Sequence, residues 1–246
     1  MRTRQRTRSR PPEPVEEGAG AALAASAEVA LDLPKLQRNT LNEAVYQQLK
    51  QALMTGRIAP GSTMTIRSLA ASFGVSLMPV REALRRLLAE HVLVLQPNRS
   101  VALPVITRER FREITRIRTS LEGLAAEEAT AHLTRADIDR LDVLNQAIER
   151  PGASRSPEYL INNREFHFIV YRNSGMPTLL SIIESLWVQI GPLLTIQQRI
   201  YSKAPDQAQL HHRRALKAFR RRDGAQARAA IVADIQDAAE IIAEHL

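Results

Sequence analysis

Between residues 69 and 87, the pattern of hydrophobic positions predicts two short helices that cross at a tight turn. Ala70, Gly74 and Val80 supply the small residue, the permissive backbone and the apolar plug that such a crossing needs, as in a helix-turn-helix. Apolar residues then recur at helical spacing and predict an inward face for the second helix. They are Val80, Leu84, Leu87 and Leu88.

The second helix is predicted to begin at Pro79, because proline presets φ and lacks only an N–H that the first turn leaves unbonded. The other face of this helix carries Arg81 and Arg85 one turn apart. A helix packed on one side, with arginines on the other, fits the major groove of DNA. The alternative is a solvent-exposed helix whose arginines have no DNA-binding role. The spacing of Ala70, Gly74 and Val80, together with the proline at the helix start, favours DNA binding.

The neighbouring segments complete a predicted winged helix-turn-helix domain over residues 39–105. Its first helix has Ala44, Val45, Leu49, Ala52 and Leu53 facing inward. The elements are a helix over Asn42–Thr55 that ends at Gly56, a turn at Pro60-Gly61, a helix over Ile66–Phe73 capped by Thr65, and strands over Val92–Gln96 and Ser100–Val105. The turn between the strands, 97–99, places Arg99 at the tip of a small β-hairpin wing.

Residues 106–246 read as almost wholly helical, with short connections that predict an antiparallel bundle of six to seven helices. The fold class is therefore mainly α. Threonine or serine precedes three of the helices as a cap, at Thr107, Thr134 and Ser156, and Gly191-Pro192 should kink the fourth. The predicted helices are Arg108–His132, Arg135–Arg150, Pro157–Asn173, Pro177–Tyr201, Asp206–Arg222 and Ala225–His245.

The charge balance of the chain predicts a polyanionic partner. The chain of 246 residues carries 34 Lys+Arg against 26 Asp+Glu, a net charge of +8. Residues 39–105 hold seven basic and three acidic side chains, whereas residues 106–246 hold twenty and eighteen. The positive field therefore concentrates on the predicted winged domain, as expected for a nucleic-acid-binding protein.

The chain has no cysteine, which excludes disulfides and thiolate metal sites and fits a reducing cytoplasm. No apolar run approaches the roughly 20 residues that span a bilayer, so no membrane partner is expected. Residues 1–38 begin with five arginines in the first ten positions, and glutamates follow. We interpret this segment as a disordered arm, which either adds phosphate contacts or has no role.

Several polar residues fall on the apolar faces of the predicted bundle helices. Burial without a partner costs at least about 1–3 kcal/mol for each such group, so these residues should meet one another or a ligand. They are Arg118, Asn163, His167, His212 and Asp234.

Two arrangements satisfy these groups. In one, Asn163, His167, His212 and Asp234 bind a divalent metal such as zinc, nickel or manganese, and Arg118 faces the carboxylate of a ligand. In the other, Asp234 pairs with Arg118, and the histidines are core residues bonded to their neighbours. The periodicity alone does not choose between them.

The chain resembles the GntR superfamily of bacterial transcription regulators, in particular its FadR-type subfamily with an FCD effector domain. Over residues 40–245 the resemblance is carried by Pro60-Gly61, Leu69-Ala70, Gly74-Val75-Ser76, the segment 79–84, the wing 97–99, the pair Arg118 and Glu122, Phe166-His167, and His212.

The resemblance implies DNA contacts from positions matching Arg67 and Arg81 and from the wing tip. The candidate DNA-contacting residues are Arg67, Ser76, Met78, Arg81, Arg85 and Arg99. Leu77 and Ser100 depart from the family pattern, which has a polar residue and a glycine there. Many members bind a metal through an aspartate and three histidines. Here Asn163 stands for the aspartate and Asp234 for the third histidine, so the set keeps one carboxylate.

These observations favour a homodimeric regulator, a repressor by family precedent, that reads a palindromic operator in double-stranded DNA and responds to a small organic acid at a metal site. One alternative is a metal-dependent enzyme that acts on an organic acid and is fused to a DNA-binding head. Another is a nonspecific nucleic-acid-binding protein that uses phosphate contacts alone.

Overall fold

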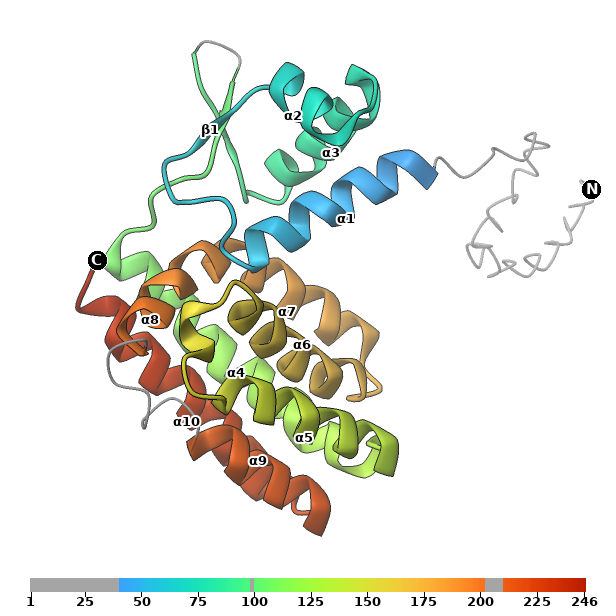
Figure 1. The fold of residues 1–246 in the computed structure, drawn as a ribbon, viewed down its shortest axis with the longest axis vertical. Coiled ribbons are helices and arrows are strands. Elements are labelled where there is room, and N and C mark those ends of the chain that lie inside the picture. Colours follow the sequence, from blue (N-terminus) through green and yellow to red (C-terminus); the bar gives the residue numbers. More distant parts are fainter. Residues whose placement is uncertain (1–39, 98–99, 202–209) are drawn as a thin grey trace, which may run out of the picture. The chain divides into compact units, whose positions relative to one another are not determined.

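The computed structural model describes residues 40–97, 100–201 and 210–246. Figure 1 shows a mainly helical fold with a small antiparallel sheet in the N-terminal part of the described chain, residues 40–105, which we call the front part. The expected arm over residues 1–38 and the wing-tip Arg99 lie outside the described residues. The division between residues 105 and 106 stays a prediction.

The front part is built from three helices and a sheet. The elements are α1 (Thr40–Met54), β1 (Thr63–Met64), α2 (Ile66–Phe73), α3 (Leu77–Ala89), β2 (Val94–Leu95) and β3 (Val101–Ala102). The strand order is β1-β3-β2, and Ala102 lies opposite both Thr63 and Val94. The predicted hairpin is therefore present with shorter strands, and β1 adds a third strand that was not predicted.

The tight turn between α2 and α3 forms as the sequence indicates. Thr65 and Ser68 make a capping box at the start of α2, and Gly74 ends this helix in the left-handed conformation at φ +65°. Glycine adopts this conformation without a Cβ penalty. Helix α3 begins two residues earlier than predicted, because Ser76 takes the N-cap position. Pro79 therefore stands in the first turn rather than at its first position, where its missing N–H is equally harmless.

The second half contains the predicted helical bundle, with the expected break at Gly191-Pro192. Between the long helices lie two 3₁₀ turns, η1 (Ala153–Arg155), which was not predicted, and η2 (Gly191–Leu193). The α-helices are α4 (Arg108–His132), α5 (Arg135–Glu149), α6 (Glu158–Arg172), α7 (Pro177–Ile190), α8 (Leu194–Tyr201), α9 (Leu210–Arg221) and α10 (Gly224–Ala243).

The caps explain why several of these helices begin where they do. The Thr107 and Thr134 side chains accept hydrogen bonds from backbone N–H groups of α4 and α5, as predicted. At α6 the N-cap residue is Pro157 rather than Ser156, which closes η1. The start predicted for α9, at Asp206, lies outside the described residues.

Apolar side chains from both halves form the core. In the front part Leu49, Leu53, Val80, Leu84 and Leu87 are buried, whereas Ala44, which we expected to face inward, is exposed. In the bundle the largest buried side chains include Phe111, Phe166, Tyr171, Trp187 and Phe219. Gly191 packs closely on α1, where an added Cβ would lie 2.5 Å from the carbonyl oxygen of Leu53.

One stretch of the described chain, Pro177–Tyr201, is long and apolar enough to cross a membrane by length and composition alone. This corrects the expectation that no such run exists. Half of its most apolar 18-residue segment is buried within the protein. The 3₁₀ turn η2 interrupts the stretch Pro177–Tyr201. Core helices of water-soluble proteins commonly meet the same test, because burial in a core and burial in lipid select the same residues.

Candidate functional site

Three side chains from three helices converge in the interior of the bundle. His167 comes from α6, His212 from α9 and Asp234 from α10. The Nε2 atom of His167 lies 3.2 Å from Oδ2 of Asp234 and 3.3 Å from Nε2 of His212, and His212 Nε2 lies 3.8 Å from the other carboxylate oxygen. The predicted meeting of these three residues is therefore present in the structure.

The separations within this His/His/Asp cluster suit a shared metal ion. Zinc bonds to imidazole nitrogen and carboxylate oxygen are about 2.0–2.2 Å long, so the ligand atoms of a tetrahedral site lie roughly 3.3 Å apart. The ligand atoms here all lie within 4.8 Å of one another, and each offers a lone pair. The donor set and its spacing fit a divalent cation.

Burial sets the charge state of the cluster. His167 and His212 are 2% and 1% exposed, and the Asp234 side chain is 16% exposed. Burial lowers the pKa of His212 to about 4, although the Asp234 carboxylate opposes this shift. Burial raises the pKa of Asp234, but His212 and the hydrogen bond with His167 outweigh it and bring this pKa to about 2. At neutral pH His212 is therefore neutral and Asp234 ionised, the forms that bind metals.

Asn163, the fourth predicted ligand, lies one turn before His167 on α6 and is half-buried. Its side chain makes no hydrogen bond to any part of the chain that the structure describes. Asn163 therefore stays a candidate ligand.

Arg118 lies in a second buried group, and its partner differs from the one that we considered. Its guanidinium binds both oxygens of Glu122, at 2.5 and 3.3 Å, one turn along α4. It does not pair with Asp234, so the predicted Arg118–Asp234 pair is wrong. The other part of that alternative, in which the histidines are core residues, stays open. Glu122 is fully buried, and it also accepts hydrogen bonds from the Tyr171 hydroxyl and from Nε1 of Trp187 at 3.0 Å.

Tyr171 connects this second group to the His/His/Asp cluster. Its hydroxyl lies 3.1 Å from Nδ1 of His167 while it donates to Glu122. The hydroxyl therefore accepts from the Nδ1–H of His167, and Nε2 faces the Asp234 carboxylate 3.2 Å away. No role was predicted from the sequence for Tyr171 or Trp187. The signal for Tyr171 was its position one turn after His167 on the same helix.

The predicted DNA-reading residues that the structure describes lie on the exposed side of the helix-turn-helix. Arg67 is exposed in the first turn of α2, and Ser76 is the N-cap of α3. Met78 and Arg81 are exposed on α3, where Val80 and Leu84 are buried. Arg85, also exposed, forms a 2.9 Å ion pair with Glu82.

Arg86 has a structural role instead. It forms ion pairs with Glu43 and Glu90, and its guanidinium stacks 3.7 Å above the Tyr46 ring. These contacts join α3 to α1. The arginines of α3 therefore divide into one that packs the domain together and two that face solvent.

Comparisons with known proteins match this architecture. The model of the gntR family of bacterial regulatory proteins matches residues 41–103, and the FCD domain model matches residues 113–237. The HTH-type transcriptional regulator McbR of Escherichia coli (strain K12) is 35% identical over 159 residues, which cover 64% of this chain and 72% of McbR. The gluconate operon transcriptional repressor of Bacillus licheniformis is 26% identical over 201 residues, covering 76% and 79% of the two chains.

A solved structure agrees with these matches. E. coli McbR/YncC superposes with a TM-score of 0.76 at 30% identity, over 83% of this chain and 98% of that one. This family and these relatives are transcriptional regulators, not enzymes, which removes the enzyme alternative. The chain therefore belongs to the GntR family of bacterial regulatory proteins, with an FCD domain after its helix-turn-helix, and is a DNA-binding transcriptional regulator.

Proposed function

We propose that this regulator represses transcription from a palindromic operator and releases the operator when a small organic acid binds at a divalent metal ion in the helical bundle. The observation that carries this proposal is the meeting of His167, His212 and Asp234 from three different helices. FCD domains are often associated with metals, and the gluconate operon relative is named as a repressor. The protein would act at the nucleoid, in the bacterial cytoplasm.

In this proposal His167, His212 and Asp234 hold the metal, with Asn163 as a fourth ligand. Two imidazoles and a carboxylate suit zinc, nickel or manganese, and affinity alone does not select among them. The bound ion would supply positive charge and open coordination positions for the carboxylate of the effector. The chain contributes a dry, preformed site, because both histidines are almost fully buried.

Arg118 is the second proposed contact for the effector. Its guanidinium already binds Glu122, so an incoming carboxylate must share Arg118 with Glu122 or displace it. Displacement of Glu122 would also break the hydrogen bond that the Tyr171 hydroxyl donates to it. The same hydroxyl contacts His167, so this change would reach a metal ligand. Effector binding at Arg118 would therefore be linked to the geometry of the metal ligands.

For DNA reading we propose Arg81 and Met78 on α3, with Ser76 at its start, as the residues that enter the major groove. Arg67 and Arg85 would reach phosphates or flanking bases, and Arg99 of the wing stays a candidate for the minor groove. This assignment is supported by the opposite face of α3, which is packed into the core and cannot contact DNA.

A palindromic operator has two half-sites and needs two DNA-binding domains to read them, so we propose a homodimer. Ile117 on α4 and Ile182 on the neighbouring α7 are 40% and 45% exposed, and we propose this face as the subunit contact. The variant Ile117→Glu should shift the mass in solution measured by light scattering to that of a monomer. The control Val143→Glu, at a 54% exposed position on α5, should not. An unchanged Ile117→Glu mass would exclude this face.

The test of the metal proposal compares His212→Ala with His245→Ala. His245 is exposed near the C-terminus and serves as a matched control. Metal content by elemental analysis should fall at least tenfold in His212→Ala and stay unchanged in His245→Ala. Gel-shift titrations on the DNA upstream of the protein's own gene should lose their response to organic acids in the first variant only. Metal-free wild-type protein would contradict the proposal.

A further inference from the structure

The net positive charge in the second half of the chain lies on a single helix. Helix α9 (Leu210–Arg221) carries five arginines and lysines and no acidic residue. The rest of residues 106–246 hold fifteen basic and eighteen acidic side chains. A cationic helix in an otherwise acidic region is a local feature, and the net charge of the DNA-binding protein does not explain it.

The cations on α9 divide into paired and unpaired sets. Arg213 binds Glu149 at 2.6 Å, and Arg220 binds Asp142 at 3.0 Å, so both join α9 to α5. The three other cations have no ion pair or hydrogen bond within the described residues. These three are Arg214, Lys217 and Arg221, spaced so that they share one face of the helix.

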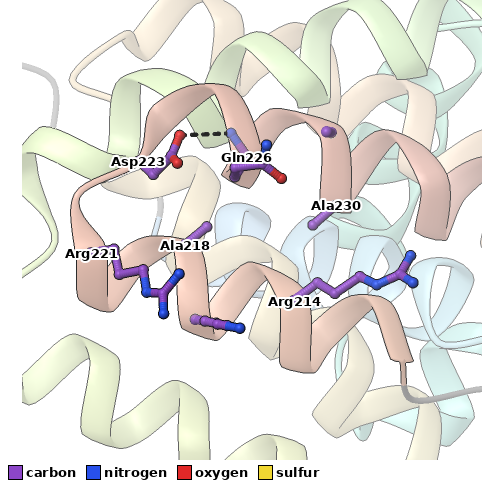
Figure 2. Close-up of a pocket in the computed structure, with 8 residues that line it drawn as sticks. Arg214, Ala218, Arg221, Asp223, Gln226 and Ala230 are labelled. Atoms are coloured by element: carbon purple, nitrogen blue, oxygen red, sulfur yellow. Dashed lines mark hydrogen bonds between the residues drawn. The ribbon is translucent and has the colours of Figure 1, made fainter.

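This unpaired face forms one wall of a groove between α9 and the start of α10, with a volume of about 470 Å³. Figure 2 shows Arg214 and Arg221 toward the two ends of the α9 wall, with Ala218 between them. Ala229 and Ala230 on α10 line the groove without filling it. The volume lies within the range of small-molecule sites, about 300–1,000 Å³.

The remaining polar lining leaves the groove with a net positive charge, because one carboxylate, Asp223, stands against three cations. Asp223 is the N-cap of α10, and its carboxylate accepts a hydrogen bond of 3.0 Å from the backbone N–H of Gln226. The Gln226 side chain is exposed at the groove. Like charges one turn apart on a helix repel one another, and an anion bound in the groove would relieve this repulsion.

We propose that this groove binds a small anion with two or more phosphate or carboxylate groups. The ends of the cationic wall, residues 214 and 221, are about 10 Å apart along the helix, a span that two anionic groups of one small molecule can bridge. Guanidinium forks match both phosphate and carboxylate oxygens. The site is distinct from the His/His/Asp cluster, although the inward faces of the same two helices supply His212 and Asp234.

The charges around the groove favour a compact anion over a nucleic acid. A long polyanion needs a continuous basic track, because each phosphate along it requires neutralisation. On α10, beyond Arg228, the charged residues are Asp234, Asp237 and Glu240, all acidic, and α5 presents Asp142 and Glu149 on the other side of α9. The cationic wall is therefore short and bordered by acidic residues.

The test is calorimetric titration of the full chain with pyrophosphate and, separately, with citrate. The variant Arg214→Gln/Lys217→Gln/Arg221→Gln should weaken binding of the preferred anion at least tenfold. Its control, Arg213→Gln/Arg220→Gln/Arg228→Gln, removes the same charge from ion-paired positions and should change the affinity less than threefold. Circular dichroism checks that both variants are folded. Comparing the two anions separates phosphate from carboxylate recognition.

A second pair of variants keeps every arginine in place. Ala229→Glu puts a carboxylate at the groove and should also weaken binding at least tenfold, whereas Ala225→Glu, exposed on α10 but outside the groove lining, should not. Because both anions also chelate metals, the titration is repeated in His212→Ala, where binding should persist. Equal loss in groove and control variants, loss in His212→Ala alone, or binding of random duplex DNA but of neither anion would overturn the proposal.

Discussion

The helix-turn-helix and the helical bundle hold the side chains that we propose as functional in opposite environments. Arg81 and Arg85 are exposed to solvent on α3, whereas Glu122, His167 and His212 are at most 2% exposed. Exposed charges contribute little to stability, but a buried charge that loses its partner costs several kcal/mol. Changes to the reading surface should therefore affect binding alone, whereas changes to the buried groups should affect stability and ligand binding together.

The largest expected effect is that of Glu122→Ala. This change leaves the Arg118 guanidinium buried without its carboxylate and removes the acceptor of Tyr171 and Trp187. Loss of one partner of a buried ion pair costs about 3–5 kcal/mol. For a chain of this length that loss lowers Tm by roughly 6–20 °C. Thermal unfolding followed by circular dichroism measures it.

Glu127→Ala is the control on the same helix. Glu127 pairs with Arg228 at 2.8 Å, with both side chains at least 40% exposed, so its loss should cost at most about 1 kcal/mol. The double variant Arg118→Met/Glu122→Met should recover part of the Glu122→Ala loss, because no charge is then left unpaired. Equal melting temperatures for Glu122→Ala and Glu127→Ala would show that burial does not distinguish the two regions.

Arg81→Ala tests the opposite side of the comparison. A specific arginine contact with a base contributes about 1–3 kcal/mol of discrimination, so preference for the operator over random DNA should fall roughly 5- to 150-fold. The melting temperature should stay within about 2 °C of wild type, because Arg81 is exposed and makes no ion pair in the described part of the chain. Competition gel shifts measure the preference. Arg135→Ala, exposed on α5, is the control. Unchanged operator preference would remove Arg81 from the reading surface.

The sequence predicted the helices best where a local cap decides the boundary. The limits of α2 and α4 agree with the prediction because Thr65 and Thr107 accept hydrogen bonds within their own first turns. Strand β1 was missed, since its two residues become a strand only by pairing with β3, nearly forty positions away. Pro79 was assigned to the wrong position of the first turn because Ser76 is an equally good start signal.

For the buried groups, periodicity predicted which residues face inward but not which of them pair. It placed Arg118 and Asp234 on inward faces, and the burial of Arg118 follows the prediction. Its partner is Glu122 on the same helix, a choice that depends on how α4, α6 and α7 pack around it. The convergence of His167, His212 and Asp234 was predicted with the help of a family resemblance, because helix packing is not readable from spacing alone.

Tyr171→Phe should have the smallest of these effects and tests whether the two buried groups are linked. The change keeps the ring but removes the hydroxyl that contacts both Glu122 and His167. Burial, with the Glu122 carboxylate, raises the pKa of Tyr171, so in the wild type this hydroxyl stays protonated and orients His167. Loss of a hydrogen bond that orients a metal ligand weakens metal binding about 10- to 100-fold.

We expect the lower end of this range for Tyr171→Phe, about tenfold, because Phe166 stacks on His212 and the packing around His167 is kept. Competition with a chromophoric chelator measures the metal affinity. Tyr159→Phe is the control, a buried tyrosine on the same helix whose hydroxyl makes no hydrogen bond within the described residues. If wild-type protein binds metal and both variants bind it equally well, the Arg118–Glu122 group stabilises the fold without influencing the cluster. Loss in Tyr171→Phe alone would instead mean that a carboxylate bound at Arg118 can alter metal affinity through one hydroxyl.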